Sequence, residues 1–157
     1  MQITFILVGK TTEPFIINGF DMYCNRISNY MQNSCIVIPD VKKSKSTDVN
    51  LIKQKEANEI LKKIPPQSYV VLLSERGKGY TSIEFSKFIA HKMQISVKNL
   101  VFIVGGAYGV DKTVEDKADA IISFSKMTYT HQFIRLMLSE QIYRAFTIIN
   151  NEPYHNE

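Results

Sequence analysis

The amino-acid sequence predicts an α/β fold with a mainly parallel sheet and helices on both of its faces. Short runs of apolar, β-branched residues alternate with longer segments whose apolar residues recur three and four positions apart. This alternation extends through the chain without an internal repeat, as is typical of parallel strands joined by helices. The 157 residues, 45% hydrophobic and 22% charged, suffice for a folded domain with its own core. We therefore expect a single domain over residues 1–157.

Five apolar runs have the length and composition of buried strands. The first is nearly all apolar, as expected for a strand that helices cover on both sides, and the Gly9-Lys10 pair ends it. Residues 74–79, which follow the third run, contain two glycines and are expected to form a loop. The predicted strands are residues 3–8, 35–38, 69–73, 100–104 and 119–124.

Four segments have the apolar spacing of helices, and most have recognisable ends. Pro14 is near the first position of one helix and Pro65 follows the end of the next, while Asp48 and Thr81 can cap helices with their side chains. The basic, glycine-free loop over 42–47 is expected to be mobile. The predicted helices are residues 14–31, 49–64, 82–93 and 131–150, with a further short helix possible before the last strand.

The last predicted helix, residues 131–150, has more apolar surface than one helix face can hold. One stripe includes Ile134 and Ile142, and a second includes Tyr143 and Phe146. A helix that is apolar on nearly two sides is either sandwiched within its own domain or shared with another chain. We expect it to form a homodimer interface that contains Ile142 and Phe146, with packing inside the monomer as the alternative.

The composition argues against a membrane or secreted protein. The longest apolar runs are about five residues, far short of the roughly 20 that cross a bilayer, and residues 1–10 lack the features of a secretory signal. Cys24 and Cys35 match no disulfide framework and are expected to be small buried side chains, so we predict a cytoplasmic location. The 19 Lys and Arg exceed the 15 Asp and Glu, and the net charge of +4 permits a polyanionic partner without requiring one.

The loops that follow the strands ending at Leu73, Val104 and Phe124 form the predicted ligand site. In an open α/β sheet, ligands bind beyond the carboxyl ends of the strands. Residues 105–109, Gly-Gly-Ala-Tyr-Gly, would let a ligand approach the backbone closely, although such a turn can also simply follow a strand. Their spacing matches neither the dinucleotide fingerprint nor the P-loop, which disfavours a kinase or an NTPase.

The three histidines do not indicate a metal site or a hydrolase. His91, His131 and His155 lack metal-ligand spacing among themselves and with the cysteines. The sequence contains no Gly-x-Ser-x-Gly elbow. We therefore expect no metal, and His131, at the start of the last helix beside the 124–130 loop, is the histidine placed closest to the predicted site.

Four segments together resemble a known family. They are VVLLSERGK (70–78), LVFIVGGAYGVDK (100–112), SFSKMTYTHQFIRLMLSEQIYRAF (123–146) and PYHNE (153–157). On these segments the chain is similar, from end to end, to the RlmH-type 23S rRNA pseudouridine N3-methyltransferases of the SPOUT class. It departs from the family pattern at Thr130, where proline is usual, and at Asn156, where a basic residue is usual.

The resemblance implies a single SPOUT methyltransferase domain with a C-terminal trefoil knot, acting as a homodimer on 23S rRNA within the assembled 70S ribosome. Its cofactor would be S-adenosylmethionine, contacted by Leu73, Gly105, Phe124, Ser125, Lys126, Met127, Thr128 and Tyr129. Around the target base, partly across the dimer, it places His131, Glu140, Arg144, Tyr154 and His155. His131 and His155 are then candidates for removing the proton of the base, and Arg144 for stabilising the resulting anion.

Two alternatives would share this fold. One is a SPOUT methyltransferase that acts on tRNA or on another rRNA position, and the other is a ribosome-binding module that has lost methyl transfer. The intact glycines and the intact 124–129 loop favour an enzyme over the binding module.

Overall fold

The structure, a computed structural model, describes residues 1–41 and 48–155. Five strands form one sheet in the order β2-β1-β4-β3-β5, and each neighbouring pair is parallel. The strands are β1 (Gln2–Val8), β2 (Asn33–Ile38), β3 (Ser68–Gly79), β4 (Asn99–Val104) and β5 (Ala120–Ser123). The helices are α1 (Pro14–Ile27), α2 (Val49–Lys63), α3 (Ser82–Gln94), α4 (Lys112–Lys117) and α5 (Phe133–Ile149). The predicted parallel α/β sheet is confirmed.

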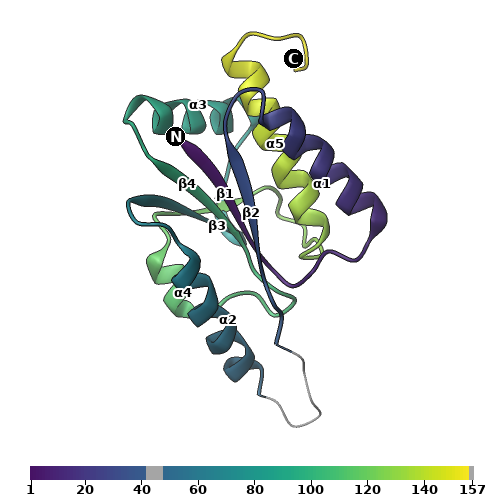
Figure 1. The fold of residues 1–157 in the computed structure, drawn as a ribbon, viewed down its shortest axis with the longest axis vertical. Helices are drawn as coiled ribbons and strands as arrows, with labels where there is room; N and C mark the ends of the chain where they lie inside the picture. Colours follow the sequence, from purple (N-terminus) through teal and green to yellow (C-terminus); the bar gives the residue numbers. More distant parts are fainter. Residues whose placement is uncertain (42–47, 156–157) are drawn as a thin grey trace.

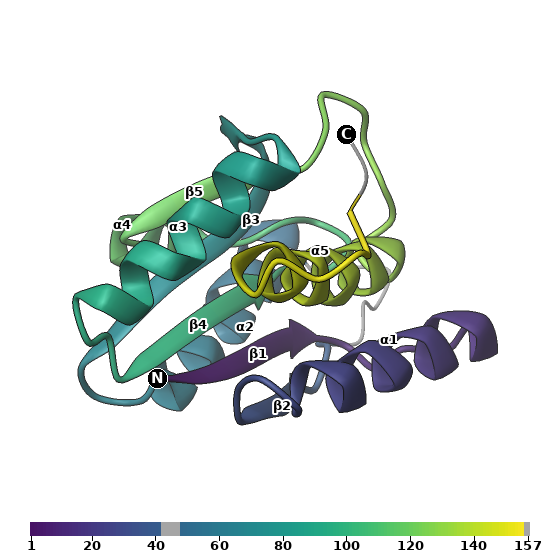
Figure 2. The ribbon, with the colours of Figure 1, turned by 90° about the horizontal axis from the view of Figure 1, so that it is seen from above.

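Helices cover both faces of the sheet, as predicted (Figure 1). Figure 2 shows α5 between α1 and α3 on one face, with α2 and α4 on the other. Two of the expected caps are present: Asp48 accepts a hydrogen bond from the Asn50 amide at 3.0 Å, and Thr81 forms a capping box with Glu84. No helix in the described ranges is long and apolar enough to cross a membrane.

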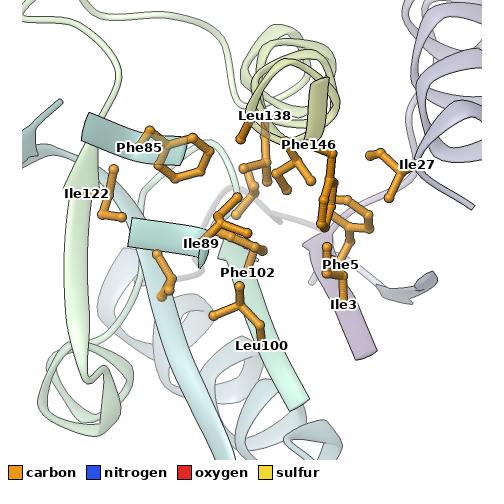
Figure 3. Packing of buried hydrophobic residues seen from close by; sticks show 14 of the residues in the cluster. Ile3, Phe5, Ile27, Phe85, Ile89, Leu100, Phe102, Ile122, Leu138 and Phe146 are labelled. Carbon is orange, nitrogen blue, oxygen red and sulfur yellow. The ribbon is translucent and has the colours of Figure 1, made fainter. Parts of the chain in front are cut away.

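Alternate residues of the central strands enter two separate cores, one on each face of the sheet. On one face, Phe5 and Phe102 pack with their rings stacked at 6.4 Å beneath residues of α5 (Figure 3). On the other face, Ile6 and Ile103 pack against α2 and α4. Such strands are buried on both sides, which explains why their sequences are continuous apolar runs.

The two apolar sides of α5 are explained within the monomer. Ile142 and Phe146 are 0% and 1% exposed and belong to the core that includes Phe5 and Phe102. On the neighbouring side of the helix, Tyr143 packs against Tyr23 of α1 at 5.8 Å between ring centroids. The expectation that Ile142 and Phe146 contact a second chain is therefore wrong, because α5 is sandwiched between α1 and α3.

Three further predictions need correction. Residues 74–79 are not a loop: β3 continues to Gly79, with a register shift against β5 between Leu73 and Lys78. The first helix ends at Ile27 rather than at residue 31, although the apolar side chains that follow still pack on the core. Cys35 is exposed on the edge strand β2 rather than buried. The loop over 42–47 lies outside the described residues.

Gly77 shows why β3 can continue past its register shift. A β-carbon at this position would lie 2.6 Å from the Ile122 carbonyl carbon of β5, so the two backbones approach more closely than a side chain allows. This close approach depends on residues from two strands, and neither strand alone indicates it.

Candidate functional site

A cleft of about 1300 Å³ opens beyond the carboxyl ends of β3, β4 and β5. Its walls come from residues 73–76 of β3, residues 104–110 at and after the end of β4, and residues 122–125 and 127–134 at and after the end of β5, with part of α1 closing one side. This is where an open α/β sheet binds ligands. The structure thus brings together the three chain segments that the sequence predicted as the site.

All but one of the predicted cofactor residues line the cleft. They are Leu73, Gly105, Phe124, Ser125, Met127, Thr128 and Tyr129. Lys126 is exposed and is absent from the lining. His131, at the start of the last helical segment, also lines the cleft.

Hydrogen bonds within the loop over 124–130 and from it to β3 and α5 set its shape. The Ser125 hydroxyl accepts from the Met127 amide at 2.9 Å, and the Thr128 hydroxyl donates to Glu75 of β3 at 2.8 Å. The Thr130 hydroxyl accepts from the Phe133 amide at 3.1 Å, so it satisfies one of the unpaired amides at the start of α5. Thr130 thus ties the loop to the helix by a hydrogen bond.

The glycine loop after β4 folds tightly on itself. The Gly109 amide donates to the Gly106 carbonyl at 3.0 Å, and Gly109 has a φ of 76°, a conformation that favours glycine. A β-carbon at Gly105 would lie 2.8 Å from Cγ1 of Val110. The folded loop therefore favours glycine at positions 105 and 109 because of its own packing and backbone conformation, whether or not a ligand binds.

His131 is in an environment that favours its neutral form. Burial lowers the pKa of His131 below the ordinary value of 6.5, and the positive charge of Arg135 lowers it further, whereas Asp40 acts in the opposite direction. A neutral imidazole has one nitrogen that can accept a proton. His131 is therefore suited to act as a base near neutral pH.

The other predicted substrate residues gather near the carboxyl end of α5. Arg144 donates to Glu140 at 2.6 Å and its guanidinium lies 3.3 Å from Nδ1 of His155. The Tyr154 hydroxyl donates to Glu140 at 3.2 Å, and the Arg144 guanidinium lies over the Tyr154 ring at 4.7 Å. We call these four residues, Glu140, Arg144, Tyr154 and His155, the tail cluster. It combines a cation, a ring and an imidazole, which are groups that can contact phosphates and bases.

Within one chain the tail cluster does not reach the cleft. None of its four residues lines the cleft. The helix rises about 1.5 Å per residue, so Arg144 lies about 16 Å along α5 from Phe133, which is at the cleft. The sequence-predicted residues therefore form two groups, one at each end of α5.

Arg135 is a residue of this region that the sequence analysis missed. It is 0% exposed and donates hydrogen bonds to the carbonyl oxygens of Val8 and Gly9, to the Thr11 hydroxyl and, at 3.1 Å, to the His131 carbonyl. The available signal was a charged residue on the core-facing side of an apolar helix, three positions before Leu138. No group of three or more His, Cys, Asp or Glu side chains within residues 1–41 and 48–155 could hold a metal ion.

The fold and the cleft are those of an α/β protein whose candidate ligand site lies between loops at the carboxyl edge of a parallel sheet. A family model described as "Predicted SPOUT methyltransferase" matches residues 1–155. Proteins named ribosomal RNA large subunit methyltransferase H are similar over the full length. The one from Parabacteroides distasonis is 46% identical over 157 residues, covering 100% of both chains. Those from Christiangramia forsetii and Porphyromonas gingivalis (strain W83) are each 42% identical, covering 99% and 100% of both chains. This chain belongs to the RlmH family of SPOUT methyltransferases.

Proposed function

We propose that this protein uses S-adenosylmethionine to methylate N3 of a pseudouridine in a 23S rRNA stem-loop, on the assembled ribosome in the cytoplasm. The observation that carries the proposal is the cleft, which is formed by the loops that the family resemblance assigns to the cofactor. Bound S-adenosylmethionine would supply the methyl group, which leaves its sulfonium sulfur as the nitrogen–carbon bond forms. The protein's residues would bind and align the reactants.

The lining of the cleft fits such a cofactor. Leu73 and Phe124 offer apolar surface for a base, and the loops around them offer backbone amides and carbonyls for its edge. The charged side chains of the lining are three carboxylates, Glu13, Glu75 and Glu115, against one guanidinium, Arg76. This excess of negative charge favours a ligand that has a positively charged centre.

We propose that residues from both ends of α5 handle the proton of the target nitrogen. With a nitrogen pKa roughly two to three units above neutral, ionisation costs about 3 to 4 kcal/mol, at about 1.36 kcal/mol per unit. His131, held neutral beside the cleft, and His155 are the candidates for accepting that proton. Arg144 is the candidate for stabilising the anion, and its bonds to Glu140 fix its guanidinium in one orientation.

We propose a homodimer in which the tail cluster of one chain reaches the cleft of its partner. The separation of about 16 Å along α5 supports this arrangement, because a single chain cannot bring Arg144 to its own cleft. Exposed apolar side chains on α1, including Phe15 at 59% and Met22 at 40%, supply a surface for the contact. Light scattering tests the dimer, and Met22→Lys should weaken it while leaving the core intact.

Mixed dimers test the shared site directly. Gly105→Val alters the cleft and Arg144→Ala alters the tail cluster, so each variant alone should have low activity when the cofactor is below saturation. A mixed dimer of the two has one site with both changes and one with neither, so random mixing should restore about a quarter of the activity. Gly105→Val mixed with His131→Ala is the matched control, because both changes lie in the cleft and no intact site results. If the first mixture also stays inactive, the shared-site proposal is wrong.

We also propose that residues 1–157 form one domain whose C-terminal part is knotted as in other SPOUT methyltransferases. The path of the chain supports this: after the edge strand β5 it returns across the sheet, and α5 packs between α1 and α3 (Figure 2). An experimental structure traced continuously through residues 100–150 tests the knot. A path that leaves α5 outside the loop over 105–119 would contradict it.

Transfer of a tritiated methyl group tests the substrate. A net charge of +4 gives only modest attraction to naked RNA, so recognition should depend on the shape of the assembled particle. We expect efficient methylation of whole ribosomes and weak methylation of isolated large subunits and free rRNA. Equal rates on all three would refute the assembled-particle proposal. Mass spectrometry of 23S rRNA from cells with and without the gene should find one methyl group on one pseudouridine, and an unchanged 23S rRNA would favour another RNA substrate.

A further inference from the structure

Arg135 is a buried cation that the core does not explain. Its side chain is one of the largest that are fully buried. No carboxylate in the described part of the chain lies within ion-pair distance of it. Removing a charge from water is costly unless it is paired and hydrogen-bonded, and an apolar side chain of similar size often stabilises a core as well or better. The stability of the fold is thus a poor reason for an arginine at this position.

The guanidinium joins two chain segments beside the cleft. On one side it donates to the Gly9 carbonyl at 2.9 Å and to the Thr11 hydroxyl at 2.7 Å, in the turn that follows β1. On the other side it donates to the His131 carbonyl at 3.1 Å. In this turn Gly9 has a φ of 81°, a backbone conformation that few other residues adopt. This conformation sets the direction in which the carbonyl groups of the turn point.

Gln132 strengthens the same connection from the residue next to His131. Its side-chain oxygen accepts from the Thr12 amide at 2.9 Å, and its side-chain nitrogen donates to the Thr12 hydroxyl at 3.1 Å. The backbone of His131 is therefore held from both sides, by Arg135 through its carbonyl and by Gln132 through the adjacent residue.

We propose that Arg135 is a positioning residue for His131, which it holds at the edge of the cleft by fixing the His131 carbonyl against the turn after β1. This inference rests on the proposed function, in which His131 is a candidate base. A group that accepts a proton must lie within hydrogen-bond reach of it, and a displacement of about 1 Å can cost about a hundredfold in rate.

The charge of Arg135 acts in the same direction as its hydrogen bonds. After burial, it is the largest influence that lowers the pKa of His131, and Asp40, after β2, is the charged group that opposes it. Removing the positive charge should therefore raise the pKa of His131 and make more of the imidazole unavailable as a base. The pKa of His131 therefore reports the electrostatic contact between the two residues separately from any loss of stability.

Two substitutions separate the charge from the hydrogen bonds. Arg135→Lys keeps the positive charge but cannot make the forked set of bonds, whereas Arg135→Met removes both at a similar volume. Leu138→Ala is the matched control, because Leu138 is 0% exposed in the same helix and belongs to the apolar core that includes Phe5 and Phe102. The readouts are the pKa of His131 by NMR titration of the cofactor-free protein, the melting temperature and the pH profile of kcat on ribosomes.

We expect Arg135→Met to raise the pKa of His131 and to lower kcat tenfold or more, with the KM for ribosomes nearly unchanged. Arg135→Lys should lower kcat while the pKa of His131 stays low. Leu138→Ala should lower only the melting temperature. If Arg135→Met fails to fold, Gln132→Ala and Thr11→Val, which remove one hydrogen-bonding side chain each near the surface, should still lower kcat severalfold in a folded protein.

The proposal is overturned if folded Arg135→Met leaves both the pKa of His131 and kcat unchanged, or if Gln132→Ala and Thr11→Val both retain full kcat. Failure of the proposed function is a separate outcome. If His131→Ala retains full turnover, then His131 is not the base, although Arg135→Met would still raise its pKa in the NMR titration. The NMR titration thus tests the coupling of the two residues without relying on methyl transfer.

Discussion

Replacing Gly105 with valine should weaken cofactor binding, and the structure gives the size of the effect. The new β-carbon would lie 2.8 Å from Cγ1 of Val110, whereas ordinary contacts begin near 3.4 Å, so the loop must shift by several tenths of an ångström. Overpacking of this kind costs about 1–3 kcal/mol. Because Gly105 and Val110 both line the cleft, a bound cofactor should force the loop back against this clash. A cost of about 1–3 kcal/mol corresponds to a dissociation constant roughly 5- to 150-fold higher.

Titration calorimetry with S-adenosylmethionine measures this change, and circular dichroism shows whether the fold persists. Gly79→Ala is the matched control: it replaces a glycine of β3 at which a β-carbon meets nothing within 4 Å, and it should bind the cofactor normally. If Gly105→Val binds with unchanged affinity and melts at an unchanged temperature, then Gly105 is an ordinary turn glycine. The loop over 105–110 would then not contact the cofactor.

Three further predictions concern α5 and the segment that leads into it. Ile142→Ala should lower the free energy of unfolding by about 2–5 kcal/mol, independently of protein concentration, because Ile142 is 0% exposed in the monomer core; denaturant titration at two concentrations measures this. Since the pKa of His131 is lowered, its neutral form should persist below pH 6.5, so the acidic limb of the kcat profile should lie below pH 6.5 and should disappear in His131→Ala if His131 is the base. Arg144→Ala should reduce kcat at least tenfold while the cofactor affinity measured by calorimetry changes less than twofold, because Arg144 lies about 16 Å along α5 from the cleft.

The sequence indicated the class of fold and the location of the site because both depend on local signals. The apolar runs, the side-chain caps at Asp48 and Thr81 and the order of strands and helices predict a parallel sheet without knowledge of any distant contact. Parallel strands place their carboxyl ends at one edge, so the loops after β4 and β5 were expected to meet there, and they do. The individual site residues came from the family resemblance and not from these local signals.

Only the tertiary structure decided how the apolar and charged residues of α5 are used. The sequence shows two apolar stripes but cannot show whether α1 and α3 or a second chain covers them, because burial depends on what packs against a helix. Arg135 lies on the core-facing side of an apolar helix, but what it bonds to becomes visible only when the turn after β1, more than 120 residues earlier, is placed beside it. Likewise, Gly77 shows its role only when β5 is placed against β3. The sequence by itself determined which segments form strands, helices and site loops, whereas the contacts between distant segments decided which side chains are buried, paired or held for chemistry.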